Sequence, residues 1–166
     1  TKENVFDLLR ISCEISISSI FKELVCYAED NFTLDELISI AAAKGANSAF
    51  FNGISVILAH KLDSALLVPE FGELDIDKLA KILTSKEAVY SDHHLLFRFI
   101  MEQVEKNKEN AVPLLEAIDI QRLDAKEAEE FMSNEFLFEK EEKETLRSDI
   151  DSINEKMANI STQVNK

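Results

Sequence analysis

Apolar residues recur at intervals of three and four along most of the chain, with polar residues between them. This spacing places the apolar side chains on one face of a helix, so the pattern predicts a series of amphipathic helices. The first is expected near residues 3–14, and a later one buries Phe131. The other predicted inward faces are, in chain order, Val5, Leu8, Leu9 and Ser12; Ile20, Phe21, Leu24, Val25 and Ala28; Leu34, Leu37, Ile38 and Ala41; Phe50, Ile54, Ile57 and Leu58; Leu62, Ala65 and Leu66; Ile76, Leu79, Ile82 and Leu83; Leu95, Leu96, Phe99, Ile100 and Val104; and Leu114, Leu115 and Ile118.

Local signals mark where several of these helices begin and end. Thr33 with Glu36 and Asp124 with Glu127 are predicted capping boxes, in which two residues three apart exchange side-chain and backbone hydrogen bonds. Gly45 is predicted to end the third helix, since glycine readily adopts the left-handed conformation that terminates helices. Single residues are predicted to cap three further helices: Ser18, Asp75 and Ser91.

Residues 135–166 form the longest predicted helix, and it is highly charged. Near its end, apolar residues alternate at intervals of four and three, which is typical of a coiled-coil seam. The seam consists of Leu146, Ile150, Ile153, Met157, Ile160 and Val164. Another helix must cover so narrow a stripe, and that helix comes either from the same chain or from a second one.

These two alternatives predict different molecules. In one, the chain is a monomeric structural domain whose last helix folds back on the bundle. In the other, the seam is the interface of a homo-oligomer, which is the reading we favour. Phe136 and Phe138 lie where the globular part meets the long helix, so they are predicted to form a hinge contact.

Composition supports an all-α domain of ordinary size. The 166 residues include only 3 Gly and 2 Pro, so there are few of the residues that build the turns of β-sheets. The net charge of −14 opposes binding to nucleic acid or to anionic membranes. No signal-peptide pattern opens the chain, and Cys13 and Cys26 form no pairing motif. We therefore expect reduced thiols and a cytoplasmic or nuclear location.

The sequence offers little for catalysis or metal binding. Asp92-His93-His94 is the best metal-like cluster, but adjacent histidines on a helix point about 100° apart and do not readily share an ion. His60 has no acid or nucleophile at a motif spacing. We therefore expect no catalytic, cofactor-binding or metal-binding residues, while a small helical enzyme or metal protein using His93, His94 and nearby carboxylates is kept as a further hypothesis.

The order of elements between Thr33 and Phe131 resembles the BACK domain, the helical module that follows a BTB domain in many BTB–kelch adaptor proteins. Residues 4–30 resemble the last two helices of a BTB fold. The predicted organisation is therefore 1–30 BTB-like, 31–134 BACK-like and 135–166 coiled coil. The segments that carry the resemblance are residues 33–37 and 41–45, residues 68–74 running into 79–83, Leu96-Phe97 with Val104, and residues 114–118 leading to Leu123.

The resemblance implies a non-enzymatic adaptor for protein partners. In the BTB–BACK family the BTB domain dimerises and grips a cullin scaffold, and the first two BACK helices, here about residues 34–44 and 47–60, add to that contact. This chain has Gln103 and Asp119 where the family usually has Trp and Arg, and the heptad helix replaces kelch repeats. A helical scaffold unrelated to ubiquitin ligases is the alternative.

Overall fold

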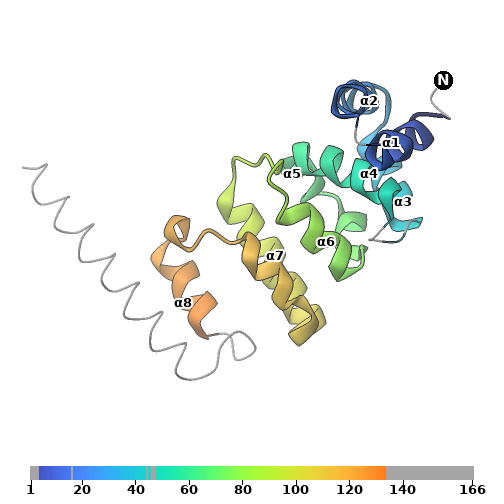
Figure 1. The fold of residues 1–166 in the computed structure, drawn as a ribbon. Coiled ribbons are helices and arrows are strands. Elements are labelled where there is room, and N and C mark those ends of the chain that lie inside the picture. The colour runs from blue at the N-terminus through green and yellow to red at the C-terminus, as the bar shows by residue number, and fades with distance from the viewer. Residues whose placement is uncertain (1–3, 16, 44, 46–47, 134–166) are drawn as a thin grey trace, which may run out of the picture. The chain divides into compact units, whose positions relative to one another are not determined.

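The structure, a computed structural model, describes residues 4–15, 17–43, 45 and 48–133. Their secondary structure is helical without any strand, which confirms the predicted all-α class (Figure 1). The helices are, in chain order, α1 (Val5–Glu14), α2 (Ser18–Asn31), α3 (Leu34–Ala43), α4 (Ala49–His60), α5 (Leu62–Ala65), η2 (Pro69–Glu73), α6 (Ile76–Leu83), α7 (His93–Asn107), η3 (Lys108–Ala117), η4 (Ile120–Arg122) and α8 (Ala125–Ser133), where η marks a 3-10 helix. The predicted helix over 135–166 lies outside the described residues.

Two compact units divide the chain, Thr1–Ile118 and Asp119–Lys166. In the first unit α4 is the central element, because it contacts α1, α2, α3, α5 and α6. Its side chains Phe51, Ile54 and Leu58 are completely buried. Phe51 is therefore a core residue, while Phe50 is half-buried with its ring centroid 5.3 Å from that of Phe6. Figure 1 shows α1 to α4 grouped at the end that carries the N-terminus.

The helices α1 and α4 pack unusually closely at Gly53. A Cβ atom placed on Gly53 would lie 3.2 Å from the Cβ of Leu9, which is tighter than ordinary van der Waals contact. Leu9 is completely buried at this crossing. The absence of a side chain at Gly53 therefore sets how near the two helix backbones can come.

The second half of this unit is built from α6, α7 and η3, with η3 packed against both helices. The chain reverses from α7 into η3 at Lys108, whose φ of 52° lies in the left-handed region. The sequence predicted a helix here with Leu114, Leu115 and Ile118 on its inward face. In the structure α7 continues to Asn107 and a 3-10 helix follows at once, with Pro113 inside it.

Both predicted capping boxes are confirmed. The Glu36 amide donates to Thr33 Oγ1 at 3.2 Å, and the Thr33 amide donates to Glu36 Oε2 at 2.8 Å. In the second unit, the Glu127 amide donates to Asp124 Oδ1 at 2.8 Å, and the Asp124 amide donates to Glu127 Oε2 at 3.2 Å. Phe131, on the helix that this second box opens, is buried as predicted.

Three single-residue predictions about helix ends are wrong. Ile17, not Ser18, is the N-cap of α2, because the Ile17 amide bonds to the Ser12 carbonyl and the helix starts directly after it. Asp92, not Ser91, caps α7 by accepting from the Leu95 amide at 3.0 Å. α3 ends at Ala43, close to Gly45, but the predicted left-handed conformation is wrong because Gly45 has no positive φ. Its carbonyl instead accepts hydrogen bonds from Ser48, which caps α4.

Asp75 precedes α6 as predicted, but its carboxylate makes no capping hydrogen bond. It pairs instead with Lys78 Nζ at 3.0 Å. The Lys78 ammonium also donates to the carbonyl of Ala42 at 2.8 Å, and its side chain is only 5% exposed. This buried lysine ties the last turn of α3 to the first turn of α6, where a positive charge suits the carbonyl end of a helix.

A second polar tie joins α5 to the segment before α7. The amide and the hydroxyl of Ser91 both donate to the carboxylate of Asp63, at 2.9 Å and 2.7 Å for Oδ2. The hydroxyl of Ser91 is the main reason why the pKa of Asp63 lies below its ordinary value. This explains why Ser91 is not free to cap α7.

Candidate interaction surface

The most unusual surface in the first unit is formed by apolar side chains of α1 and α2 that face away from the core. On α1 they are Leu8 and Ile11, and Ile15 directly follows the helix; their exposed fractions are 47, 40 and 57%. At and along α2 they are Ile17, Ile20 and Tyr27, with exposed fractions of 37, 46 and 41%. Each set recurs at intervals of three, four or seven, so it lies along one side of its helix. We call these six residues the α1–α2 apolar face.

The sequence pattern placed two of these residues wrongly. Leu8 and Ile20 were predicted to point into the core, but the core side of α1 is formed by Val5 and Leu9, and both are buried. On α2 the core side is formed by Val25 and Ala28. Each helix thus carries apolar residues on two sides, and periodicity merged the two into one broad face.

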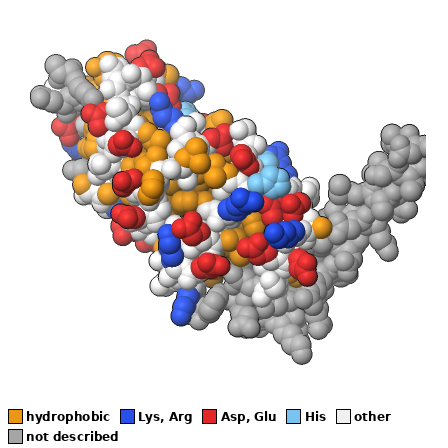
Figure 2. Space-filling view, turned by 180° about the vertical axis from the view of Figure 1, so that it is seen from behind, with side chains coloured by type: hydrophobic (Ala, Val, Ile, Leu, Met, Phe, Trp, Pro, Cys, Tyr) orange, Lys and Arg blue, Asp and Glu red, His pale blue; other side chains and the backbone are white. Residues whose placement is uncertain are grey.

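An apolar surface of this kind is energetically significant. Removing a Leu or Ile side chain completely from water is worth about 1.5–3 kcal/mol. The six residues are each roughly half exposed, so covering all of them would contribute roughly 5 kcal/mol before the cost of association. Figure 2 shows apolar side chains gathered, among acidic ones, at the end of the molecule that carries the N-terminus. Grouped exposed apolar residues mark interaction sites more often than single ones do.

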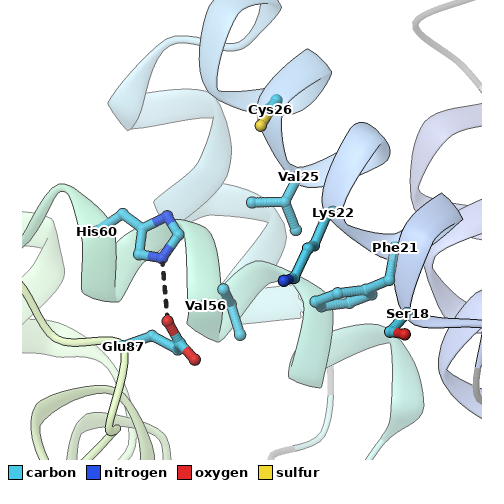
Figure 3. A pocket seen from close by; sticks show the side chains of 8 residues that line it. All are labelled: Ser18, Phe21, Lys22, Val25, Cys26, Val56, His60 and Glu87. Carbon is cyan, nitrogen blue, oxygen red and sulfur yellow. Dashed lines mark ion pairs between the residues drawn. The ribbon is translucent and has the colours of Figure 1, made fainter.

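Beside this face, α2 and α4 enclose a groove of about 400 Å³. Apolar side chains of Phe21, Val25 and Val56 form its middle, as Figure 3 shows. The remaining lining residues are Ser18, Lys22, Cys26, His60 and Glu87. The volume lies at the lower end of the range for ligand pockets, which suits a small apolar group better than a large cofactor.

The polar groups at one end of the groove are joined to each other. His60 Nδ1 lies 2.5 Å from Glu29 Oε1, and its Nε2 lies 3.7 Å from Glu87 Oε2. Lys61 Nζ donates to the carbonyl of Glu29 at 2.9 Å. From the sequence we expect no chemical role for His60, because no acid or nucleophile lies at a motif spacing from it. Its partners come from α2 and from the segment between α6 and α7, which lie 31 and 27 residues away in sequence, so no local motif could have revealed them.

Two residues of the metal-like cluster, Asp92 and His93, have structural roles in the described part of the chain. Asp92 caps α7, and the ring of His93 packs edge-to-face on Tyr90 with centroids 4.9 Å apart. Cys26 is an exposed thiol that lines the groove. The side chain of Cys13 lies outside the described residues.

The predicted coiled-coil seam and hinge contact also lie outside the described residues. They comprise Phe136, Phe138, Leu146, Ile150, Ile153, Met157, Ile160 and Val164. Their roles in pairing chains and in hinge contact therefore stay predictions. The α1–α2 apolar face and the groove were not predicted, and the signal that could have revealed the face is the second apolar stripe on each helix.

Comparisons with protein-family models, with curated proteins and with solved structures each find no match. The resemblance to the BACK domain therefore depends on the quoted segments alone. Among the described helices, none combines the length and the apolar character needed to cross a membrane.

Proposed function

We propose that this chain is a non-enzymatic protein–protein interaction module, a BACK-like helical spacer of a BTB-type adaptor. The single observation that carries this proposal is the α1–α2 apolar face. Six partly exposed apolar side chains on two adjoining helices contribute little to the core, and their position suits contact with another protein surface.

The sequence extends this proposal in two directions. The seam from Leu146 to Val164 is proposed to pair chains into a homo-oligomer, because so narrow an apolar stripe requires a second helix. The resemblance to BTB–BACK adaptors makes a cullin ubiquitin-ligase scaffold the proposed partner of the full-length protein. Proteins rather than nucleic acids or membranes are the expected partners, given the net charge of −14.

Site-specific photo-crosslinking tests the proposed face. A photoreactive phenylalanine analogue at position 20 is expected to trap a protein partner in the source cells, and mass spectrometry identifies the adduct. The matched control carries the same analogue at Glu116, an exposed residue of η3 outside the face. The adduct should disappear when Ile11 and Tyr27 are changed to Ser. If position 20 gives no more adduct than position 116, or crosslinks only within its own chain, the interaction module is refuted at this surface.

Sedimentation velocity tests the proposed pairing of chains. The full chain is expected to form a dimer or a larger assembly, and the double variant Ile153→Asp/Ile160→Asp is expected to be monomeric. A wild-type chain that stays monomeric at high concentration would support the alternative in which the last helix folds back.

A further inference from the structure

The groove between α2 and α4 differs in chemical character from one end to the other. Its middle is apolar, with the side chains of Phe21, Val25 and Val56 converging there (Figure 3). A space of about 400 Å³ accommodates one or two aliphatic side chains of a partner. The polar groups at the two ends therefore decide which partner fits.

The end of the groove at Ser18 is positive. Lys22 extends its ammonium group over the groove beside Phe21, as Figure 3 shows. Within the described part of the chain, Lys22 has neither an ion-pair partner nor a hydrogen-bond acceptor. This is also the end where α2 begins, and Ile17 at the N-cap supplies no side-chain hydrogen bond. The positive end of the helix dipole thus adds to the charge of Lys22.

The opposite end is acidic, but its charges are already engaged. Glu29 and Glu87 both contact the imidazole of His60. Glu87 is the more exposed of the two, with 63% of its side chain accessible against 24% for Glu29. Both carboxylates contact the imidazole, whereas Lys22 has no partner among the described residues, so Lys22 is the charged group of the lining that is left to pair with a partner's carboxylate.

We propose that the groove binds a short peptide segment of a partner protein that presents apolar side chains next to a carboxylate. The apolar side chains contact Val25 and Val56, and the carboxylate pairs with the ammonium of Lys22, which Figure 3 shows between Val56 and Phe21. This inference rests on the proposed function and names the chemistry of one partner.

Three peptides that differ only in charge test this assignment. They are N-acetylated and C-amidated hexapeptides of the form Ala-X-Leu-Leu-X-Ala, with X as Glu, Gln or Lys. Binding at physiological salt is followed through the NMR shifts of the Val25 and Val56 methyl groups. The Glu peptide is expected to bind up to about fivefold more tightly than the Gln peptide, the gain typical of an exposed ion pair.

Two variants assign this gain to a single residue. Lys22→Gln should remove the preference for the Glu peptide and leave binding of the Gln peptide unchanged. Lys86→Gln, which removes an exposed lysine beside Glu87 that does not line the groove, should keep the preference. Both residues are exposed, so neither substitution is expected to unfold the chain.

Several results would overturn the assignment. Tighter binding of the Lys peptide would show that the acidic end dominates. Equal binding of all three peptides, or a preference for the Glu peptide that survives in Lys22→Gln, would refute the proposed ion pair between the peptide carboxylate and Lys22. Shifts of these methyl groups with hexanoate but with none of the peptides would make the groove a small-molecule site. The crosslink at position 20 is independent of Lys22, because residues two apart on a helix point about 160° apart, so either proposal can fail alone.

Discussion

Replacing Lys108 with glycine should stabilise this protein. Lys108 joins α7 to η3 with φ 52° and ψ −129°, and no other described residue, glycines included, has a positive φ. A side chain in such a sparsely populated region costs about 1–3 kcal/mol, whereas glycine adopts the region freely. Glycine loses more conformational entropy on folding, which offsets about 0.5–1 kcal/mol of this gain. We therefore expect Lys108→Gly to raise the free energy of unfolding by about 1 kcal/mol.

Equilibrium urea denaturation followed by circular dichroism measures this change, and Glu105→Gly is the matched control. Glu105 is an exposed residue in the last turns of α7, where glycine should cost about 1 kcal/mol because the helix restricts its backbone. Both substitutions replace a long charged side chain with glycine, and the sites are three residues apart. Opposite signs would thus isolate the backbone conformation as the cause. If both variants lose stability equally, the left-handed conformation of Lys108 is refuted.

Three further predictions test the packing and the polar ties. Gly53→Ala should lower the midpoint of thermal unfolding, because overpacking costs about 1–3 kcal/mol and outweighs a gain of about 1 kcal/mol in helix propensity. Gly45→Ala, with open space around the new methyl group, should not lower it. Lys78→Met should reduce the free energy of unfolding by about 1–3 kcal/mol by removing its hydrogen bond to the α3 carbonyl, and unchanged stability would contradict that tie. The lowered pKa of Asp63 means that its bonds to Ser91 stabilise the fold above about pH 4 and are lost as the pH falls through that lowered pKa. The stability difference between wild type and Asp63→Asn should therefore be present at neutral pH and vanish in acid, and a difference that persists in acid would refute it.

The parts of the fold that sequence predicted well depend on residues close together in the chain. The capping boxes at Thr33 and Asp124 were confirmed. Each needs only a threonine hydroxyl or an aspartate carboxylate and a glutamate three residues later in the chain. The predicted cap at Ser91 was wrong because it depends on a residue far away in the chain. Ser91 is drawn to Asp63, which lies 28 residues earlier, and no local pattern contains that contact.

The candidate surface was harder to predict because periodicity reports only that a residue is apolar and on a certain side of a helix. Leu8 and Leu9 are adjacent leucines of the same helix, yet one is about half exposed and the other completely buried. The difference arises from where α4 packs on α1, with Gly53 against Leu9. The groove is likewise formed by α2, α4 and Glu87, whose approach is set by tertiary packing and not by any motif.

The three sides of α2 can be assigned to different roles because they make different contacts. Val25 and Ala28 are buried in the core, so substitutions there should reduce stability and binding together. Ile20 is nearly half exposed and Lys22 has no partner within the described part of the chain, so their removal should leave the fold intact. A helix that needed only to fold would gain solubility from polar residues at position 20. The packing of this domain gives no reason for an isoleucine there, whereas the proposed contact with a partner does.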